Sequence, residues 1–358
     1  MHSGRTTRTV DENLKWCHDA VQGVSRTFAI TIDALREPMS SRICVGYLLC
    51  RIADTVEDAG HVPAEEKADL LRRYDRVLAP SDPTTVESFR SAVEPWIPEE
   101  RTNDWDVVAS VPRVTSTYAS LPEGTRTALR GPVRELVSGM ATFVERHADT
   151  GGLRIETVEE LEEYCWYAAG TVGDLITNLL VENAEAERAT TLEENARSFA
   201  LLLQLVNVAK DVSVDYDEEN NVYLPATWLD EAGIDADEVA DPARADDVAR
   251  VVERVTEHAA GYLDDAQAYL EALPETDGNT LSAWAIPYLL AVATIRELRD
   301  RPTDVVTEGT VKVPRTEVHA LIQLFETGSV GRDDIGDLRA RMAAQPLHRA
   351  DDLSQSYS

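Results

Sequence analysis

The amino-acid sequence predicts an all-α protein. Apolar residues recur at helical spacing through most of the 358 residues, and no stretch shows the repeated apolar–polar alternation that strands require. Segments rich in Pro, Gly and Asp fall between the helical stretches, where they are expected to end one helix before the next begins. Hydrophobic residues make up 43% of the chain, which is ample material for a core.

The helices are expected in sequence order, each bounded by such a segment. The first stops at Gly23, residues 80–83 separate the third from the fourth, and Pro98 comes after the fourth. Residues 150–152 come after the fifth, and Pro274 after the eighth. The expected helices are 11–23, 40–59, 64–77, 86–96, 123–146, 158–181, 192–214, 246–272 and 281–299.

No repeat or linker divides the chain, so residues 1–345 are expected to form one domain. Residues 218–225 are expected to form a loop after the seventh helix. Residues 346–358 are expected to form a frayed tail.

The charge of the chain excludes one class of partner. Lys and Arg number 34 against 65 Asp and Glu, which gives a net charge of −31. Nucleic acids need a cationic surface, so a nucleic-acid partner is not expected. Such a surface predicts a salt-rich cytoplasm, as in a halophile, because dissolved salt screens the self-repulsion. Most single acidic clusters are therefore interpreted as solvated surface.

The location of the protein is also predicted by its composition. No run of 18 apolar residues is present, and the N-terminus lacks the apolar stretch of a signal peptide. We expect a soluble cytoplasmic protein whose membrane contact, for product release, is at most peripheral. The cysteines show no Cys-x-x-Cys spacing and are expected to be buried thiols that bind no metal: Cys17, Cys44, Cys50 and Cys165.

A first polar stripe interrupts an otherwise apolar helical segment. Tyr47, Arg51, Asp54 and Asp58 share one helix face, with the two aspartates about 6 Å apart along the axis. A polar stripe that enters a core is unfavourable unless a ligand or ion satisfies it. The alternative is an Arg–Asp ion pair at the end of a surface helix.

A second stripe occurs about 150 residues later and consists of Gln204, Asn207, Asp211 and Asp215. Two carboxylate pairs on facing helices can hold Mg²⁺, which proteins usually bind through one or two carboxylates plus substrate phosphates. The two stripes together predict an enzyme that ionises a diphosphate.

Two shorter motifs add to this prediction. Residues 164–173 begin with Tyr164 and are rich in Ala and Gly, which suits either close helix packing, the commoner explanation, or space for an apolar ligand. Ser25-Arg26-Thr27-Phe28 lies just after Gly23 and can offer a hydroxyl and a guanidinium to an anion.

Taken in the order in which they occur along the chain, the four motifs resemble those of the squalene/phytoene synthase family. The resemblance extends from about Ser25 to Arg315. It implies an isoprenoid-synthase-like helical bundle around a central active-site cavity. It also implies that two prenyl diphosphates are joined head to head with the help of Mg²⁺.

Three segments resemble the squalene-forming branch of the family: 54–58, 138–143, and 286–294 together with 311–313. This implies that two farnesyl diphosphates give presqualene diphosphate, which NADPH then reduces at a site containing Lys312 and Arg315. Some positions depart from the family pattern. Lys210 stands where Arg is usual, Asn220 and Asn221 stand where a basic residue is usual, and Pro314 displaces Arg315 by one position.

The resemblance also implies roles for the polar residues. Tyr164 would assist ionisation or remove the proton that closes the cyclopropane. The expected metal ligands are Asp54, Asp58, Asn207, Asp211 and Asp215. The four aspartates among them are also expected to be catalytic, together with Tyr164. The expected substrate-binding residues are Ser25, Arg26, Phe28, Tyr47, Arg51, Gln204, Asn207 and Lys210.

Two alternatives remain open at this point. A phytoene or dehydrosqualene synthase would share both aspartate motifs but stop before hydride transfer, or take a longer substrate. An acidic helical protein that merely binds cations would not be an enzyme at all.

Overall fold

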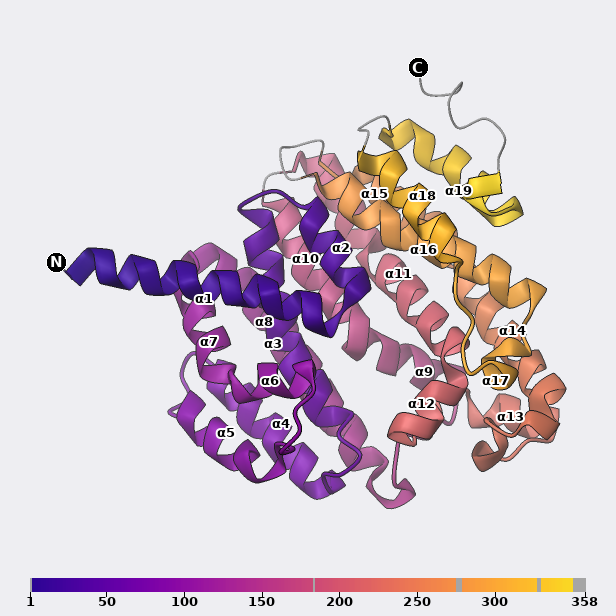
Figure 1. Cartoon of the computed structure of the whole chain (residues 1–358), viewed down its shortest axis with the longest axis horizontal. Helices are drawn as coiled ribbons and strands as arrows, with labels where there is room; N and C mark the ends of the chain where they lie inside the picture. Colours follow the sequence, from indigo (N-terminus) through magenta and orange to yellow (C-terminus); the bar gives the residue numbers. More distant parts are fainter. Residues whose placement is uncertain (1, 183, 275–278, 327–329, 350–358) are drawn as a thin grey trace.

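Helices build the whole of the described structure, a computed structural model of the chain (Figure 1). It describes residues 2–182, 184–274, 279–326 and 330–349, without the side chains of residues 2–10, 26, 27 and 349. Within these residues the β-structure is limited to an isolated parallel bridge between Arg154 and Val222. The predicted all-α class is confirmed.

The first part of the chain forms eight α-helices with short 3-10 turns at Glu94–Trp96 and Ala148–Thr150. The helices are α1 His2–Val24, α2 Arg26–Ala34, α3 Met39–Glu57, α4 Ala64–Leu78, α5 Val86–Val93, α6 Asn103–Ala109, α7 Val111–Ser120 and α8 Glu123–Arg146.

The second part forms the remaining α-helices, a π-helical turn at Trp166–Gly170 and further 3-10 turns at Ala236–Glu238, Pro242–Arg244, Arg332–Asp334 and Leu347–Arg349. The helices are α9 Val158–Cys165, α10 Thr171–Val181, α11 Ala186–Lys210, α12 Val212–Glu219, α13 Ala226–Ala232, α14 Ala245–Ala260, α15 Leu263–Ala272, α16 Thr280–Asp300, α17 Asp304–Thr307, α18 Arg315–Glu326 and α19 Ile335–Ala344.

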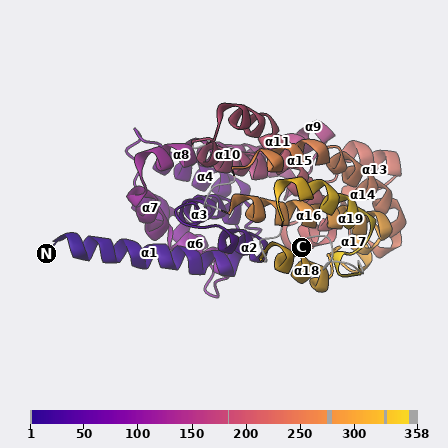
Figure 2. The ribbon, with the colours of Figure 1, turned by 90° about the horizontal axis from the view of Figure 1, so that it is seen from above.

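The two parts lie side by side, with α10 and α11 between them (Figures 1 and 2). Helix α8 packs on α3, α4 and α10, and α11 packs on α10, α14, α15 and α16. Leu48 from α3, Phe143 from α8, Leu201 from α11 and Leu289 from α16 are fully buried members of one continuous apolar core. This packing fixes α3 and α11, which carry the two polar stripes, on opposite sides of the interior.

The predicted helices are present, but three of them are interrupted. The segment expected at 192–214 begins earlier, at Ala186, and breaks at Asp211, whose φ of −111° and ψ of 18° are not helical. The segment at 246–272 breaks at Gly261 and Tyr262, where glycine has low helix propensity. The segment at 158–181 contains the π-helical turn, a local irregularity that is frequent at functional sites.

Several short helices were not predicted: α2, α6, α7, α13, α17, α18 and α19. Helices of this length depend on tertiary packing more than on their own propensity, so their periodic signal is weak. Two of them do carry an N-cap signal, since the hydroxyls of Ser25 and Thr102 accept hydrogen bonds from the backbone N–H groups of Phe28 and Trp105. The tail expected from residue 346 is not found at residues 347–349, which form a helical turn with Leu347 buried; residues 350–358 lie outside the described residues.

Helix α16 is the one helix in the described part that is long and apolar enough to cross a membrane. Of its most apolar window, 72% is buried inside the protein, as is usual for a core helix. The four cysteines are buried free thiols, as predicted.

A buried ion pair holds the last helices on the body. Both guanidinium Nη atoms of Arg296 on α16 donate to the Glu317 carboxylate on α18, at 3.1 and 2.7 Å. Arg296 also donates to the Met342 carbonyl on α19, and Glu317 accepts from the Leu347 backbone N–H at 3.1 Å. The side chain of Glu317 is 0% exposed, so its charge depends on these partners.

We predict that Arg296→Met lowers the free energy of unfolding by about 3–5 kcal/mol, because it leaves a buried carboxylate unpaired. The matched control is Arg299→Met on the same helix, whose pair with Glu257 is largely exposed and should contribute below about 1 kcal/mol. Urea unfolding at constant KCl measures both. Equal losses in the two variants would contradict the assigned role of the buried pair.

Candidate active site

A cavity of about 200 Å³ lies where α3, α8, α9, α11 and α12 meet. It brings together residues from both predicted stripes and the third motif, which are far apart in the sequence. Its lining consists of Arg51, Asp54, Glu57, Asp58, Met140, Tyr164, Ala168, Gln204, Asn207, Val208, Asp211, Asp215, Glu219 and Tyr223.

The first stripe enters the cavity from the last turns of α3, and Asp58 is the residue that ends this helix. The Nε atom of Arg51 lies 4.0 Å from Asp54 Oδ2 and 3.8 Å from Asp104 Oδ1. The other carboxylate oxygen of Asp54 is buried and has no hydrogen-bond partner. Burial raises the pKa of Asp54 to about 7, against the opposing effect of Arg51 and with a further increase from Asp58.

The second stripe does not lie on one continuous helix, which corrects the prediction. Helix α11 ends at Lys210, whose ammonium pairs with the Asp211 carboxylate instead of lining the cavity. Thr310 Oγ1 donates to the other Asp211 oxygen at 2.6 Å. Asp215 lies one turn further on α12, where burial and then the Asp211 charge raise its pKa to about 8.

Two lining carboxylates were not predicted as site residues. Glu57 is buried, and burial together with its neighbour Asp58 raises its pKa well above the ordinary value. Burial, and then the Asp58 charge, raise the pKa of Glu219 to about 8. The sequence signals were the position of Glu57 between the two aspartates of its motif and that of Glu219 one turn after Asp215.

The lining suits a divalent cation. Carboxylates from α3 and α12 raise one another's pKa, and one oxygen of Asp54 lacks any partner, so added positive charge would stabilise the ionised forms. In the part of the chain that the structure describes, no three His, Cys, Asp or Glu side chains converge closely enough to hold a metal by themselves. An ion here would therefore take further oxygens from a ligand or water, which is the usual coordination of Mg²⁺.

Tyr164 lies at the end of α9 beside these carboxylates. Its hydroxyl is 3.0 Å from that of Tyr223, and the two rings stack at 4.8 Å. The Phe143 and Tyr164 rings pack edge to face, with their centroids 5.4 Å apart. Burial, and then the Glu57 carboxylate, raise the pKa of Tyr164 well above its ordinary value, so its hydroxyl is held protonated. Tyr223 was not predicted as a site residue; it belongs to the loop after α12.

The residues predicted around Ser25 lie behind the first stripe. Ser25 caps α2, and the Phe28 ring stacks on Tyr47 at 4.0 Å. The Tyr47 hydroxyl accepts a hydrogen bond from Arg51, so this cluster orients the guanidinium without lining the cavity. The side chain of Arg26 lies outside the described residues.

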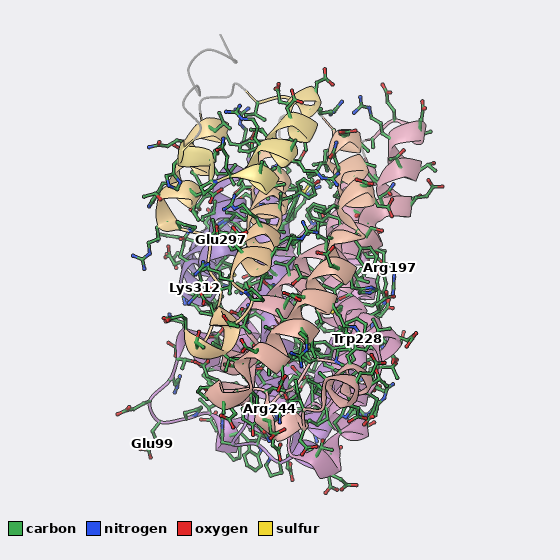
Figure 3. The ribbon with its side chains drawn as sticks, turned by 90° about the vertical axis from the view of Figure 1, so that its right-hand side faces the viewer. Glu99, Arg197, Trp228, Arg244, Glu297 and Lys312 are labelled. Atoms are coloured by element: carbon green, nitrogen blue, oxygen red, sulfur yellow. The ribbon has the colours of Figure 1, made fainter. Side chains whose placement is uncertain are left out.

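Lys312 and Arg315, the predicted cofactor-binding residues, do not line the cavity either. Both side chains are exposed, and Lys312 lies on the outer surface in Figure 3. Their segment is nevertheless tied to the second stripe, because the Val311 backbone N–H donates to the Lys210 carbonyl at 3.2 Å.

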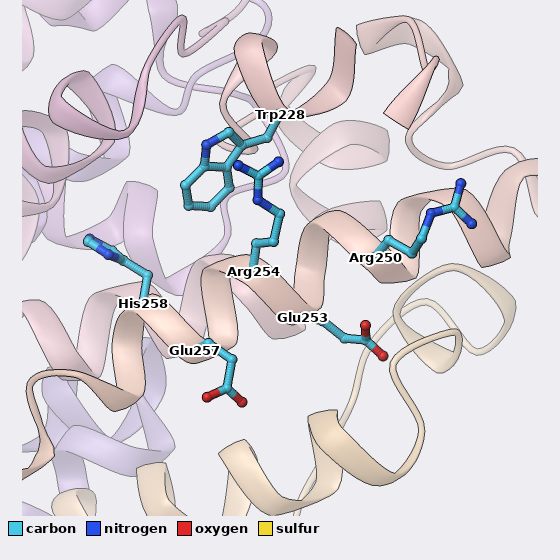
Figure 4. A pocket seen from close by; sticks show the side chains of 6 residues that line it. All are labelled: Trp228, Arg250, Glu253, Arg254, Glu257 and His258. Carbon is cyan, nitrogen blue, oxygen red and sulfur yellow. The ribbon is translucent and has the colours of Figure 1, made fainter. Parts of the chain in front are cut away.

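A larger hollow of about 420 Å³ lies on α14, away from these residues. Figure 4 shows Arg254 stacked on the Trp228 ring at 4.3 Å, with Glu253 and Glu257 turned to the other side of the helix. Arg254 also pairs with Glu231 at 2.6 Å. Glu257 pairs with Arg299 in the same way, and no reactive groups converge in this surface groove, so the buried cavity is the candidate active site.

Comparison with known proteins agrees with the motifs. The family model described as squalene/phytoene synthase matches residues 21–317. Squalene synthase from Schizosaccharomyces pombe is 26% identical over 314 residues, which cover 87% of this chain and 65% of the yeast protein. Lycopaoctaene synthase from Botryococcus braunii is 27% identical over 310 residues, which cover 86% of this chain and 65% of that protein. Human squalene synthase is 26% identical over 319 residues, covering 88% and 70%.

Solved structures share the fold. The complex of TcSQS with a ligand superimposes with a TM-score of 0.74 at 23% identity, covering 93% of this chain and 98% of the other. A dehydrosqualene synthase superimposes with a TM-score of 0.56 at 18% identity, covering 94% of this chain and 97% of the other.

The similarity to individual relatives is distant, whereas the family match is extensive. This chain spans about 65% of the length of the first two curated relatives, and those relatives form different products. The family model, in contrast, covers most of the chain and all four motifs. The chain therefore belongs to the squalene/phytoene synthase family, whose members are prenyl-transferring enzymes.

Proposed function

We propose that this protein is a squalene synthase. It joins two farnesyl diphosphates head to head into presqualene diphosphate with Mg²⁺, and then reduces this intermediate to squalene with NADPH. The observation that carries the proposal is the convergence of both aspartate stripes and Tyr164 on one cavity. Several relatives with similarity over most of the chain are squalene synthases, which supports the choice of reaction.

Asp54 and Asp58 from α3, and Asn207, Asp211 and Asp215 from the other side, would hold the Mg²⁺ ions. The ions supply positive charge that neutralises a diphosphate leaving group. Arg51, held by Tyr47 and close to Asp54, adds a fixed guanidinium at the same end of the cavity. Lys210 would act on the diphosphate site through its ion pair with the Asp211 carboxylate.

The remainder of the lining protects the reaction. Met140, Ala168 and Val208 present apolar surface beside the carboxylates, and the fully buried Phe143 lies behind Tyr164. A carbocation formed in such surroundings meets little water that could quench it. Tyr164 lines the same cavity as the carboxylates, which supports a role in ionisation.

A dehydrosqualene or phytoene synthase is the second candidate. The observation that favours it is the exposure of Lys312 and Arg315, which do not line the cavity where a hydride would be delivered. A non-enzymatic cation-binding protein is disfavoured by membership of an enzyme family.

We further propose that the protein is a single domain that works in a salt-rich cytoplasm. The support is its net charge of −31 and the absence of a linker.

We predict that Asp54→Asn and Asp211→Asn each lower turnover of farnesyl diphosphate by at least about 100-fold, because each removes a carboxylate charge that would hold Mg²⁺ against the diphosphate. The control is Asp19→Asn, an exposed carboxylate paired with Lys15, which should leave turnover unchanged. Circular dichroism in molar KCl checks that all variants are folded. Retained turnover in both active-site variants would refute the proposed metal site.

The product formed with and without NADPH separates the two candidate reactions. With farnesyl diphosphate and Mg²⁺ in molar KCl, we expect squalene only when NADPH is present. Presqualene diphosphate or dehydrosqualene regardless of NADPH would identify the second candidate and remove the cofactor role of Lys312. Phytoene from geranylgeranyl diphosphate, with no product from farnesyl diphosphate, would reassign the substrate.

The melting temperature is expected to rise steeply between 0.1 and 1 M KCl, since the screening length falls from about 10 Å to about 3 Å over this range. Thermal melts monitored by circular dichroism measure the change. Sucrose at matched osmolality serves as the control, because it favours burial without screening charge. A melting temperature that responds equally to both solutes would contradict the proposed salt requirement.

A further inference from the structure

The hydroxyl of Tyr164 is the end of a buried hydrogen-bond chain. Asn221 Nδ2 donates to the Tyr223 hydroxyl at 3.1 Å, and that hydroxyl is 3.0 Å from the Tyr164 hydroxyl. The side chains are nearly inaccessible, at 5% exposure for Tyr164, 5% for Asn221 and 8% for Tyr223. In such a site each polar hydrogen needs a partner, so the direction of every hydrogen bond can be worked out.

The direction is fixed at Asn221. Its Oδ1 accepts from the Leu153 backbone N–H at 2.8 Å, and a backbone N–H can only donate. The amide nitrogen must therefore face the other way, where it donates one hydrogen to Glu219 Oε2 at 3.1 Å and the other to Tyr223. The Leu153 contact thereby removes the usual ambiguity about which amide atom is oxygen.

The hydrogen-bond directions at the two tyrosines follow from the same reasoning. The Tyr223 oxygen accepts from Asn221, so its single hydrogen needs an acceptor, and the Tyr164 oxygen is the one within reach. Tyr164 then accepts from Tyr223 and has its own hydrogen free for the cavity, which both tyrosines line. The reverse direction would make the Tyr223 oxygen accept two hydrogen bonds and leave the Tyr164 oxygen with none, whereas the head-to-tail chain from Asn221 through Tyr223 to Tyr164 lets successive hydrogen bonds strengthen one another.

We propose that Tyr223 is a positioning residue that donates its hydroxyl hydrogen to Tyr164, so that Tyr164 presents a polarised O–H to the diphosphate held at the carboxylate end of the cavity. Accepting a hydrogen bond makes Tyr164 a better donor and a poorer base. The arrangement selects assistance to ionisation over proton removal as the role of Tyr164. It rests on the proposed function only in requiring a diphosphate ligand, whatever prenyl chain that ligand carries.

Binding of inorganic diphosphate in the presence of Mg²⁺, measured by isothermal titration calorimetry in molar KCl, tests this role without turnover. We expect Tyr164→Phe to weaken binding about tenfold, because it removes a hydrogen bond to a charged group. Tyr223→Phe should weaken it about threefold through the lost polarisation. The double variant should equal Tyr164→Phe alone, because Tyr223 acts only through Tyr164.

The matched control is Tyr269→Phe, which removes another buried hydroxyl, bonded to Thr177 at 3.0 Å, away from the cavity. It should bind diphosphate as the wild type does. Unchanged binding by Tyr223→Phe, or a further threefold loss in the double variant, would overturn the positioning role. No diphosphate binding by the wild type would overturn both this role and the proposed function. Diphosphate binding without squalene formation would contradict the proposed reaction and leave the positioning role of Tyr223 standing.

Discussion

Repulsion among buried carboxylates is the constraint around which this molecule is organised. Asp54, Glu57 and Asp58 from α3 face Asp215 and Glu219 from α12, and burial makes their charges harder to sustain. Such a group stays ionised only where a ligand or ion offsets the desolvation, and otherwise it takes up a proton. Arg51 offsets part of the charge, but the unpartnered oxygen of Asp54 shows that the offset is incomplete. Helix α10 packs on α3, α8 and α11, and this apolar packing holds the groups close despite their repulsion.

The irregular segments serve the same site. The break at Asp211 separates α11 from α12, and Asp215 and Glu219 on α12 both line the cavity. The loop after α12 is anchored by the bridge between Arg154 and Val222, which presents Tyr223 to Tyr164. Gly152 is required at this anchor, since a Cβ atom there would lie 1.9 Å from the Asn220 carbonyl oxygen. Local departures from regular helix thus set the positions of the reactive side chains.

The sequence was informative where periodicity and composition act over many residues. Helix α8 was predicted with its observed bounds, and Asp54 and Asp215 were placed together from spacing alone. It was less informative where a single tertiary contact decides. The contact of Asp211 with Thr310 joins segments 99 residues apart that no local pattern connects. Tyr223 was missed for the same reason, because its neighbours in space come from α9 and its neighbours in sequence form a loop.

The segment of residues 310–315 shows how backbone and side chains can point to different conclusions. Its backbone is bound to the end of α11 through Val311, and Thr310 reaches an aspartate of the cavity. The Lys312 carbonyl accepts from Arg301 at 2.8 Å, which fixes the path of the chain at this point. Pro314 favours an extended conformation for Val313, so the chain continues outward into α18 with the Lys312 side chain on the surface. Proximity to the second aspartate stripe is therefore a property of Thr310 and Val311, whereas the Lys312 side chain lies on the surface.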